Sequence, residues 1–179
     1  KQQGQMYYDF VLKNYEHNIK NIKLCSINDE QGNPQKEEYF FGEYSPTTLR
    51  YFKAASDINY CFGDTSKMNI LEIGGGYGGQ CVVYDALFNF KSWTIVDLPE
   101  VIELQKKYMS KKSNVNYISC YDIENNNDYD LTISNYAFSE VIRKYQDKYI
   151  NAFMDNEEKI YMTVNFIPQT DKIYETMYK

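Results

Sequence analysis

The residues best suited to chemistry lie in a glycine-rich segment near the middle of the chain, which reads Ile70-Leu71-Glu72-Ile73-Gly74-Gly75-Gly76-Tyr77-Gly78-Gly79. Its apolar first half is typical of a buried strand, and glycines let the backbone take positive φ and approach a ligand closely. The helix expected next presents free N–H groups and a partial positive charge at its N-terminus. Four glycines within five positions disfavour an ordinary structural turn, so the segment predicts a cofactor site.

Two classes of cofactor use this geometry, and the spacing of the glycines fits both. Gly74, Gly76 and Gly79 satisfy the G-x-G-x-x-G pattern of dinucleotide sites, which place an acidic residue about 20 positions further on. Asp97 lies close to that position. Gly74, Gly76 and Gly78 equally satisfy the G-x-G-x-G pattern of sites for S-adenosylmethionine (SAM). The glycines alone therefore leave both an NAD-dependent enzyme and a SAM enzyme open.

Two carboxylates near the glycines separate these cofactors. Glu72 stands two residues before Gly74, where it favours SAM, because SAM has an α-ammonium group and lacks the pyrophosphate that a carboxylate would repel. Asp97 ends the next expected strand, where a carboxylate can accept hydrogen bonds from both ribose hydroxyls. Asp97 can also cap the helix that Pro99 begins, and the two roles can coexist. These positions predict SAM as the cofactor.

The segments around the two carboxylates resemble a known family. The segment 72–78 and the Asp-Leu-Pro-x-Val element that begins at Asp97 resemble class I SAM-dependent O-methyltransferases. The wider arrangement, including segments 45–51 and 134–140, is most similar to sugar O-methyltransferases of bacterial polysaccharide pathways. The resemblance covers about residues 40–168. It implies methyl transfer from SAM to a hydroxyl of a small molecule, a sugar or a sugar-containing glycan precursor.

The resemblance also implies roles for individual positions. The cofactor would be held by Glu72, Gly74, Gly76, Gly78, Asp97, Leu98, Asp122 and Asn135. Asp122 matches the position that commonly meets the adenine amino group, with a loop carboxylate as the alternative. Asn135 and Tyr136 would line the methyl-transfer site, and Tyr44 and Arg50 would cover the acceptor. Arg50 would bind a carboxylate or phosphate of the acceptor, unless it forms a surface salt bridge.

A general base is the remaining part that the reaction requires. Methyl transfer from a sulfonium is a displacement that mainly needs alignment, but a hydroxyl acceptor must also lose its proton. Plant-type relatives use a histidine after the fourth strand, whereas this stretch reads Tyr136-Ala137-Phe138-Ser139-Glu140. An imidazole base from that position is excluded. Glu140 is the best candidate there, although a carboxylate is also favoured at a helix start.

The composition limits the class of partner. The 179 residues carry 19 Lys and Arg against 25 Asp and Glu, a formal charge of −6. Nucleic acid and anionic membranes select basic surfaces, so neither is the expected partner. The four cysteines form no C-x-x-C pair and there is only one histidine, so no metal site is expected. We expect a cytoplasmic protein whose cysteines are reduced. No signal peptide or membrane-spanning apolar run is visible.

The elements that must position these residues alternate between strands and helices. We expect strands over 68–73, 92–97, 115–120, 129–135 and 159–166, helices over 79–88, 99–108 and 139–154, and a last helix from about Thr170. This alternation predicts a Rossmann-like α/β fold with a doubly wound, mostly parallel sheet in residues 63–179. Residues 1–62 are expected to form a helical extension, with one helix near 4–20 and another capped by Ser45 and begun by Pro46.

The class I methyltransferase fold has two more strands than the five expected here. The apolar strand over 159–166 would then be an open edge, which invites association. We therefore expect either a fragment of a longer protein or a short form whose open edge is covered by another subunit, as in a homo-oligomer, or by the N-terminal segment. Two further functions stay open. One is an NAD-dependent oxidoreductase or epimerase, although no Tyr-x-x-x-Lys follows the fourth strand, and the other is a non-catalytic SAM-fold subunit.

Overall fold

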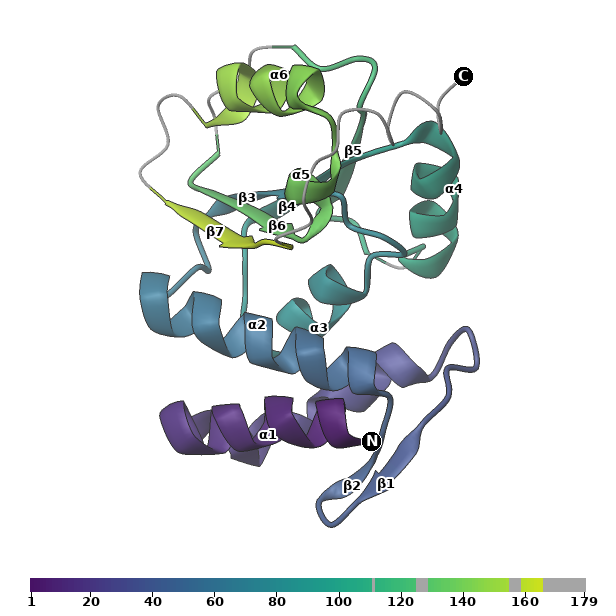
Figure 1. The fold of residues 1–179 in the computed structure, drawn as a ribbon, viewed down its shortest axis with the longest axis vertical. Coiled ribbons are helices and arrows are strands. Elements are labelled where there is room, and N and C mark those ends of the chain that lie inside the picture. Colours follow the sequence, from purple (N-terminus) through teal and green to yellow (C-terminus); the bar gives the residue numbers. More distant parts are fainter. Residues whose placement is uncertain (111, 125–128, 155–158, 166–179) are drawn as a thin grey trace.

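The computed structural model describes residues 1–110, 112–124, 129–154 and 159–165, which form an N-terminal part stacked below an α/β part (Figure 1). The N-terminal part contains α1 (Gln2–Asn14), the 3-10 helix η1 (Glu16–Asp29), strands β1 (Glu37–Tyr39) and β2 (Gly42–Tyr44), and α2 (Pro46–Phe62). Helix α2 begins as predicted. The Ser45 hydroxyl accepts from the Thr48 amide at 3.1 Å, and Pro46 takes the first helical position.

The α/β part confirms the predicted fold class. Its elements are β3 (Asn69–Ile73), α3 (Gly79–Leu87), β4 (Ser92–Asp97), α4 (Pro99–Tyr108), β5 (Val115–Ser119), β6 (Leu131–Asn135), α5 (Ala137–Glu140), α6 (Arg143–Phe153) and β7 (Ile160–Thr163). The five strands form one parallel sheet in the order β5-β4-β3-β6-β7. The chain therefore winds outward from β3 in one direction and then, from β6, in the other. The carboxyl ends of β3 and β6 form the crevice where such sheets bind ligands.

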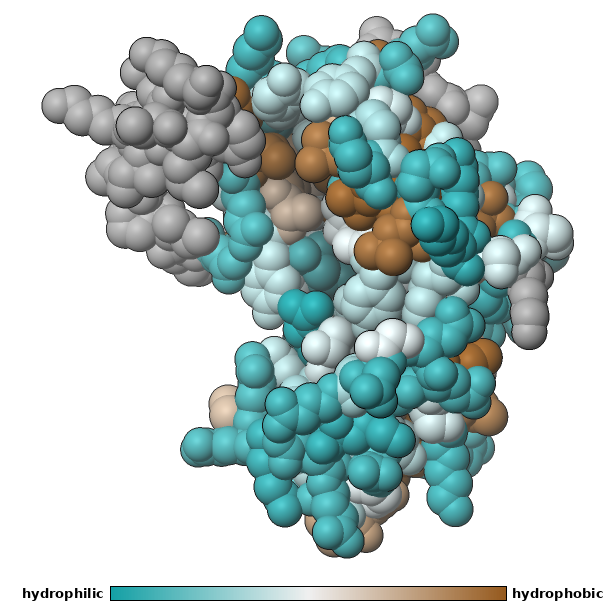
Figure 2. Space-filling view, turned by 90° about the vertical axis from the view of Figure 1, so that its right-hand side faces the viewer, coloured by the Kyte–Doolittle hydropathy of each residue, from teal (hydrophilic) through white to brown (hydrophobic). Residues whose placement is uncertain are grey.

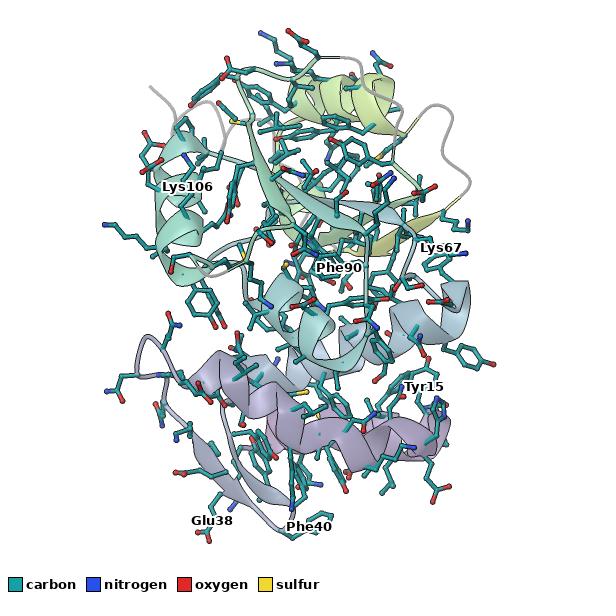
Figure 3. The ribbon with its side chains drawn as sticks, turned by 180° about the vertical axis from the view of Figure 1, so that it is seen from behind. Tyr15, Glu38, Phe40, Lys67, Phe90 and Lys106 are labelled. Atoms are coloured by element: carbon teal, nitrogen blue, oxygen red, sulfur yellow. The ribbon has the colours of Figure 1, made fainter. Side chains whose placement is uncertain are left out.

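Helices cover both faces of this sheet, which explains the nearly continuous apolar strands. One face packs Ile70, Ile95 and Ile133 against α3 and α2. The other face packs Leu71 and Ile73, among others, against α6. In Figure 3, Phe90 lies inside beside the sheet, 5.1 Å from the ring of Trp93, whereas Glu38 and Phe40 point outward from the hairpin. In Figure 2, apolar surface gathers over the α/β part, and the N-terminal part is mostly hydrophilic.

The N-terminal part differs from the expected helical extension. The helix expected near 4–20 ends at Asn14 and gives way to η1, and a hairpin follows that the sequence analysis did not predict. Aromatic packing holds the hairpin in place. The ring of Phe41 stacks on Tyr8 of α1 with centroids 3.7 Å apart, and Tyr39 stacks on Phe41 at 5.0 Å. These side chains form a second, smaller core beneath α2.

The single helix expected over 139–154 is also wrong, because the chain forms α5 and α6 with Val141 and Ile142 extended between them. β-Branched residues are weak helix formers, and the Gln146 side chain donates to the Phe138 carbonyl at 3.0 Å, which satisfies the end of α5. The strand expected over 159–166 is observed as β7, and the helix expected from Thr170 lies outside the described residues. The break keeps Glu140 at the carboxyl edge of the sheet.

Candidate functional site

The glycine turn between β3 and α3 uses its glycines for different purposes. Gly74, Gly76 and Gly78 have φ of 74°, 56° and 97°, which L-residues rarely adopt. A Cβ on Gly74 would lie 2.1 Å from the Cβ of Ala137 in α5, so Gly74 allows close packing. A Cβ on Gly76 would meet nothing within 4 Å. Gly76 therefore borders open space at the crevice, as a turn that receives a ligand requires.

Gly79, the first residue of α3, is closely packed. A Cβ there would lie 2.5 Å from the Tyr51 ring and 2.7 Å from the Asn28 Oδ1 atom. The last glycine of the G-x-G-x-x-G pattern commonly serves close packing, so this contact is compatible with either cofactor. A Cβ on Gly78 would likewise lie 2.5 Å from Cε of Met109, so the glycine spacing leaves both cofactors open and the choice rests on Glu72.

Asp97 ends β4 beside the glycine turn, as predicted. Its carboxylate accepts from the Leu98 amide at 2.9 Å and from Nε2 of Gln105 at 3.0 Å. The same Gln105 amide donates to the Gly76 carbonyl at 2.8 Å, and Gln105 is fully buried on α4. Burial raises the pKa of Asp97, and the hydrogen bonds from Leu98, Gln105 and the glycine backbone oppose that shift. Sequence reasoning missed Gln105, because an isolated Gln in a helix carries no pattern.

Glu72 lies beneath the turn on the face of the sheet that α3 covers. Only 2% of Glu72 is exposed, and its Oε2 accepts from the indole Nε1 of Trp93 at 2.9 Å. Glu72 pairs in register with Ile95, so Trp93, two residues earlier, points to the same face. Burial raises the pKa of Glu72 to about 7; the Trp93 hydrogen bond opposes this shift and the charge of Asp97 adds to it. Glu72 can therefore hold either a proton or a nearby cation.

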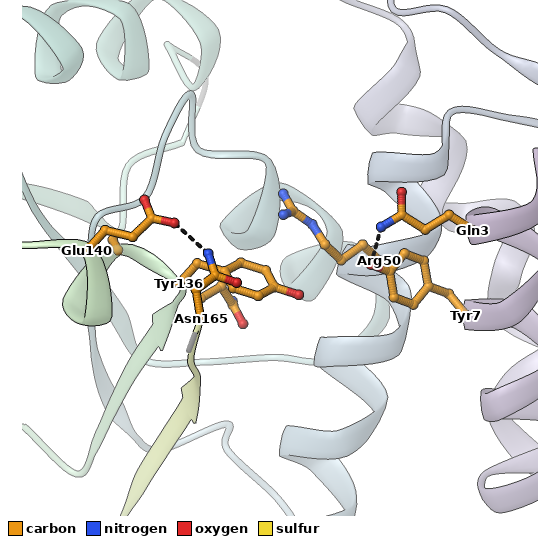
Figure 4. A pocket seen from close by; sticks show the side chains of 8 residues that line it. Gln3, Tyr7, Arg50, Tyr136, Glu140 and Asn165 are labelled. Atoms are coloured by element: carbon orange, nitrogen blue, oxygen red, sulfur yellow. Dashed lines mark hydrogen bonds between the residues drawn. The ribbon is translucent and has the colours of Figure 1, made fainter. Parts of the chain in front are cut away.

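A hollow of about 490 Å³ opens at the carboxyl ends of β6 and β7, next to the turn (Figure 4). Its lining comes from α1, α2, the β6–α5 junction and the residues after β7, and consists of Gln3, Tyr7, Arg50, Asn135, Tyr136, Ala137, Glu140 and Asn165. The structure thus brings together four residues predicted from the sequence, Arg50, Asn135, Tyr136 and Glu140. Gln3 and Tyr7 were missed, because only tertiary packing carries α1 to this edge of the sheet.

Tyr136 is held in an unusual conformation at the centre of this lining. Its φ is 74°, and its amide donates to the Thr163 carbonyl at 2.7 Å. A non-glycine residue with such a φ costs on the order of 1–3 kcal/mol and is often found at functional sites. The Arg50 guanidinium lies 5.5 Å from the centroid of its ring. Burial raises the pKa of the Tyr136 hydroxyl, so it remains a hydrogen-bond donor.

The polar groups beside Tyr136 have defined partners. Asn135 donates to Gln80 at 3.4 Å and accepts from the Thr163 hydroxyl at 3.1 Å. Glu140 is exposed, and its Oε1 accepts from the Asn165 amide at 2.6 Å. Among the described residues, none is recorded as donating to the other carboxylate oxygen of Glu140, which lines the hollow.

Three predicted site residues lie elsewhere. Tyr44 is 4% exposed in the core beneath α2, so its side chain does not reach the hollow. The prediction that Tyr44 covers the acceptor is therefore wrong. The alternation of strand β2 turns it inward. Leu98 is 45% exposed at the start of α4, and Asp122 is exposed after β5. Both stand at the carboxyl edge of the sheet, where their cofactor roles stay predictions.

The N-terminal part reaches the turn through Asn28 of η1, which is 2% exposed. Its Nδ2 donates to the Tyr77 hydroxyl at 3.0 Å and to the Thr48 hydroxyl at 2.7 Å. Its Oδ1 accepts from the Tyr108 hydroxyl at 2.9 Å. Because Tyr77 lies inside the glycine turn, Asn28 ties the turn, α2 and α4 to one buried amide.

Two other classes of site find no support in the described part of the chain. No group of three His, Cys, Asp or Glu side chains within it is arranged to hold a metal ion. None of the helices described is long and apolar enough to cross a membrane.

Comparison with known proteins adds evidence on the fold. No family model matches the sequence, and no curated protein matches it. Among solved structures, the chain is similar to protein 1320 of Thermoplasma acidophilum, with 17% identity and a TM-score of 0.58 over 87% of this chain and 74% of that one. It is also similar to a protein of Pyrococcus horikoshii proposed to be an RNA methyltransferase, with 12% identity and a TM-score of 0.59 over 88% and 79%.

A third similar structure is CalS10 of Micromonospora echinaspora, an amino pentose methyltransferase solved with SAM bound. The identity is 13% and the TM-score 0.52, over 67% of this chain and 51% of that chain, so this chain spans about half of its length. With the parallel sheet and its flanking helices, these similarities establish the class I methyltransferase fold.

Proposed function

We propose that this protein transfers a methyl group from SAM to a hydroxyl of a small molecule. The observation that carries the proposal is the direct contact between two sites at the crevice. The glycine turn with Asp97 and the polar hollow meet where Gly74 packs on Ala137. A cofactor over the turn and an acceptor in the hollow would therefore be neighbours, as displacement at a methyl group requires.

The residues of the turn fit SAM. Gly76 borders open space, Asp97 beside it would accept from ribose hydroxyls, and Glu72 lies below the turn, where an ammonium group would favour its charged form. When bound, SAM supplies a methyl group on a positively charged sulfur. The chain needs to provide alignment, exclusion of water and removal of one proton. Asp122 and Leu98 would complete the adenine side of the site.

The acceptor hollow favours a polyol such as a sugar. Hydroxyl and amide groups dominate its lining, with Tyr7, Tyr136, Asn135 and Gln3 contributing them. Glu140 would take the proton that the acceptor hydroxyl loses when the acceptor oxygen is methylated. S-adenosylhomocysteine would be the leaving group, because the electrons of the broken carbon–sulfur bond stay on sulfur. Asn165 would hold the Glu140 carboxylate in position. The amino pentose methyltransferase among the similar structures shows that this fold can act on sugars.

The test is methyl transfer from isotopically labelled SAM, measured as label in products and as formation of S-adenosylhomocysteine. The acceptors are neutral sugars, charged sugars, nucleotide sugars and a structured RNA, and Asp97→Ala is the inactive comparison. The net charge of −6 leads us to expect label in a sugar and none in RNA. Transfer to RNA alone would contradict the acceptor class, and no transfer to any acceptor would favour a non-catalytic subunit.

A further inference from the structure

Arg50 carries the positive charge of the hollow. The sequence has two arginines, Arg50 and Arg143. Arg143 pairs with Asp147 on the surface of α6 at 2.8 Å. No ion pair in the described residues involves Arg50, although acidic residues outnumber basic ones. An arginine that lines a hollow and lacks a carboxylate is a candidate receptor for an anion.

Two tyrosines hold the Arg50 guanidinium in place. It lies 5.1 Å from the ring centroid of Tyr51 and 5.5 Å from that of Tyr136. Figure 4 shows the guanidinium extending from α2 into the hollow, between Tyr136 and the pair Gln3 and Tyr7. Arg50 also donates a hydrogen bond to the Tyr51 hydroxyl, and a guanidinium has five N–H donors, so others can bind an anion. That planar fork matches the two oxygens of a carboxylate or phosphate.

The opposite side of the hollow carries the negative charge of Glu140. In Figure 4, Glu140 lies on one side of Tyr136 and the Arg50 guanidinium on the other. The other lining residues are uncharged. An anionic molecule would be attracted at Arg50 and repelled at Glu140, so a single orientation is favoured. This orientation turns the uncharged, hydroxyl-bearing part of the molecule toward Glu140.

We propose that the natural acceptor is an anionic sugar, whose carboxylate or phosphate is bound by Arg50 while a hydroxyl faces Glu140. This inference rests on the proposed methyl transfer and specifies its acceptor class.

The test is calorimetric titration of the full chain with D-glucuronate, D-glucose 6-phosphate and D-glucose, with and without saturating S-adenosylhomocysteine. At least one anionic probe is expected to bind about tenfold or more tightly than glucose, the scale of one charge-assisted contact. Arg50→Ala should remove that advantage, and Arg50→Lys should keep part of it, because lysine retains the charge without the fork. Arg143→Ala is the matched control and should behave as the parent protein.

The outcomes separate this inference from the proposed function. If S-adenosylhomocysteine binds but neither anionic probe binds more tightly than glucose, the anionic acceptor is wrong. It is equally wrong if Arg50→Ala retains the preference. If the anionic probes bind through Arg50 but S-adenosylhomocysteine does not bind, the anion site stands and the methyltransferase proposal fails. Unchanged binding of S-adenosylhomocysteine by Arg50→Ala shows that this variant is folded.

Discussion

The indole N–H of Trp93 donates to the carboxylate of Glu72 at 2.9 Å, on the face of the sheet that α3 covers and below the glycine turn. Both side chains are buried, and Oε2 of Glu72 lies 3.3 Å from where a Cβ of Gly75 would stand. The carboxyl group is thus enclosed by apolar neighbours, with the cofactor side of the turn immediately above it. The protonation of the Glu72 carboxyl group is therefore linked both to folding and to the charge of a ligand bound at the turn.

This linkage predicts a pH-dependent effect of Glu72→Gln on stability. The pKa of Glu72 is about 7 in the folded chain against 4.5 for the free side chain, so the folded state holds the proton more tightly. The stabilisation from this protonation is greatest below pH 4.5. It is lost as the pH rises toward and through 7, by about 3 kcal/mol in total. The variant lacks this loss, so its stability relative to the parent should rise between pH 5 and pH 8.

Urea unfolding at both pH values measures the effect. Glu38→Gln, on the exposed surface of the hairpin, is the control and should show no such difference (Figure 3). An equal effect of Glu72→Gln at pH 5 and pH 8 would mean that the carboxyl group is not titrating in the folded core.

The glycine turn predicts two different consequences of adding one methyl group. Gly74→Ala should destabilise by about 1–3 kcal/mol through its collision with Ala137, and Ala137→Gly in the same chain should restore part of that loss. Gly76→Ala has space, so it should cost about 1–2 kcal/mol for its φ of 56°. Its methyl group would nonetheless enter the cofactor space and weaken S-adenosylhomocysteine binding about tenfold or more. Thermal unfolding and calorimetry separate the two effects, and normal cofactor binding by Gly76→Ala would show that the ligand does not approach the turn there.

Asn28 predicts a coupling between the N-terminal part and the cofactor turn. Asn28→Ala leaves the hydroxyls of Tyr77 and Tyr108 without their buried partner, at a cost of about 1–3 kcal/mol. Binding of S-adenosylhomocysteine should weaken as well, because Tyr77 belongs to the turn. A double-mutant cycle with Tyr77→Phe tests the pair, with Asn151→Ala on the exposed face of α6 as the control. Additive effects of the two substitutions would rule out the coupling.

Glu140 predicts a separation of catalysis from cofactor binding. Glu140→Gln keeps an oxygen that can accept from Asn165 but cannot take a proton, so kcat should fall about a hundredfold or more. The affinity for S-adenosylhomocysteine should stay within about twofold. Steady-state kinetics with the acceptor found by the transfer assay, and Glu38→Gln as the control, measure this. An unchanged kcat would leave Glu140 with only its hydrogen bond to Asn165.

The sequence could predict the parts that depend on local pattern. The alternation of strands and helices, the glycine turn, Asp97 at a strand end and the cap at Ser45 all follow from short segments. The hairpin could not be predicted, because its strands have three residues each and are held by Tyr8 from another element. The break between α5 and α6 depends on the contact between Gln146 and Phe138. The placement of Tyr7 beside Tyr136 depends on packing between segments that are distant in the sequence.

The measurement that bears most directly on the central claim is calorimetric titration of the chain with S-adenosylhomocysteine and, separately, with NADH. We expect S-adenosylhomocysteine to bind at micromolar concentration. Asp97→Ala should weaken that binding about tenfold or more, a loss of about 1.4 kcal/mol. Glu38→Gln should leave the affinity unchanged. NADH should bind more weakly, because the Glu72 carboxyl group lies below the turn, where its negative charge would repel a pyrophosphate. Tighter binding of NADH than of S-adenosylhomocysteine would contradict the account.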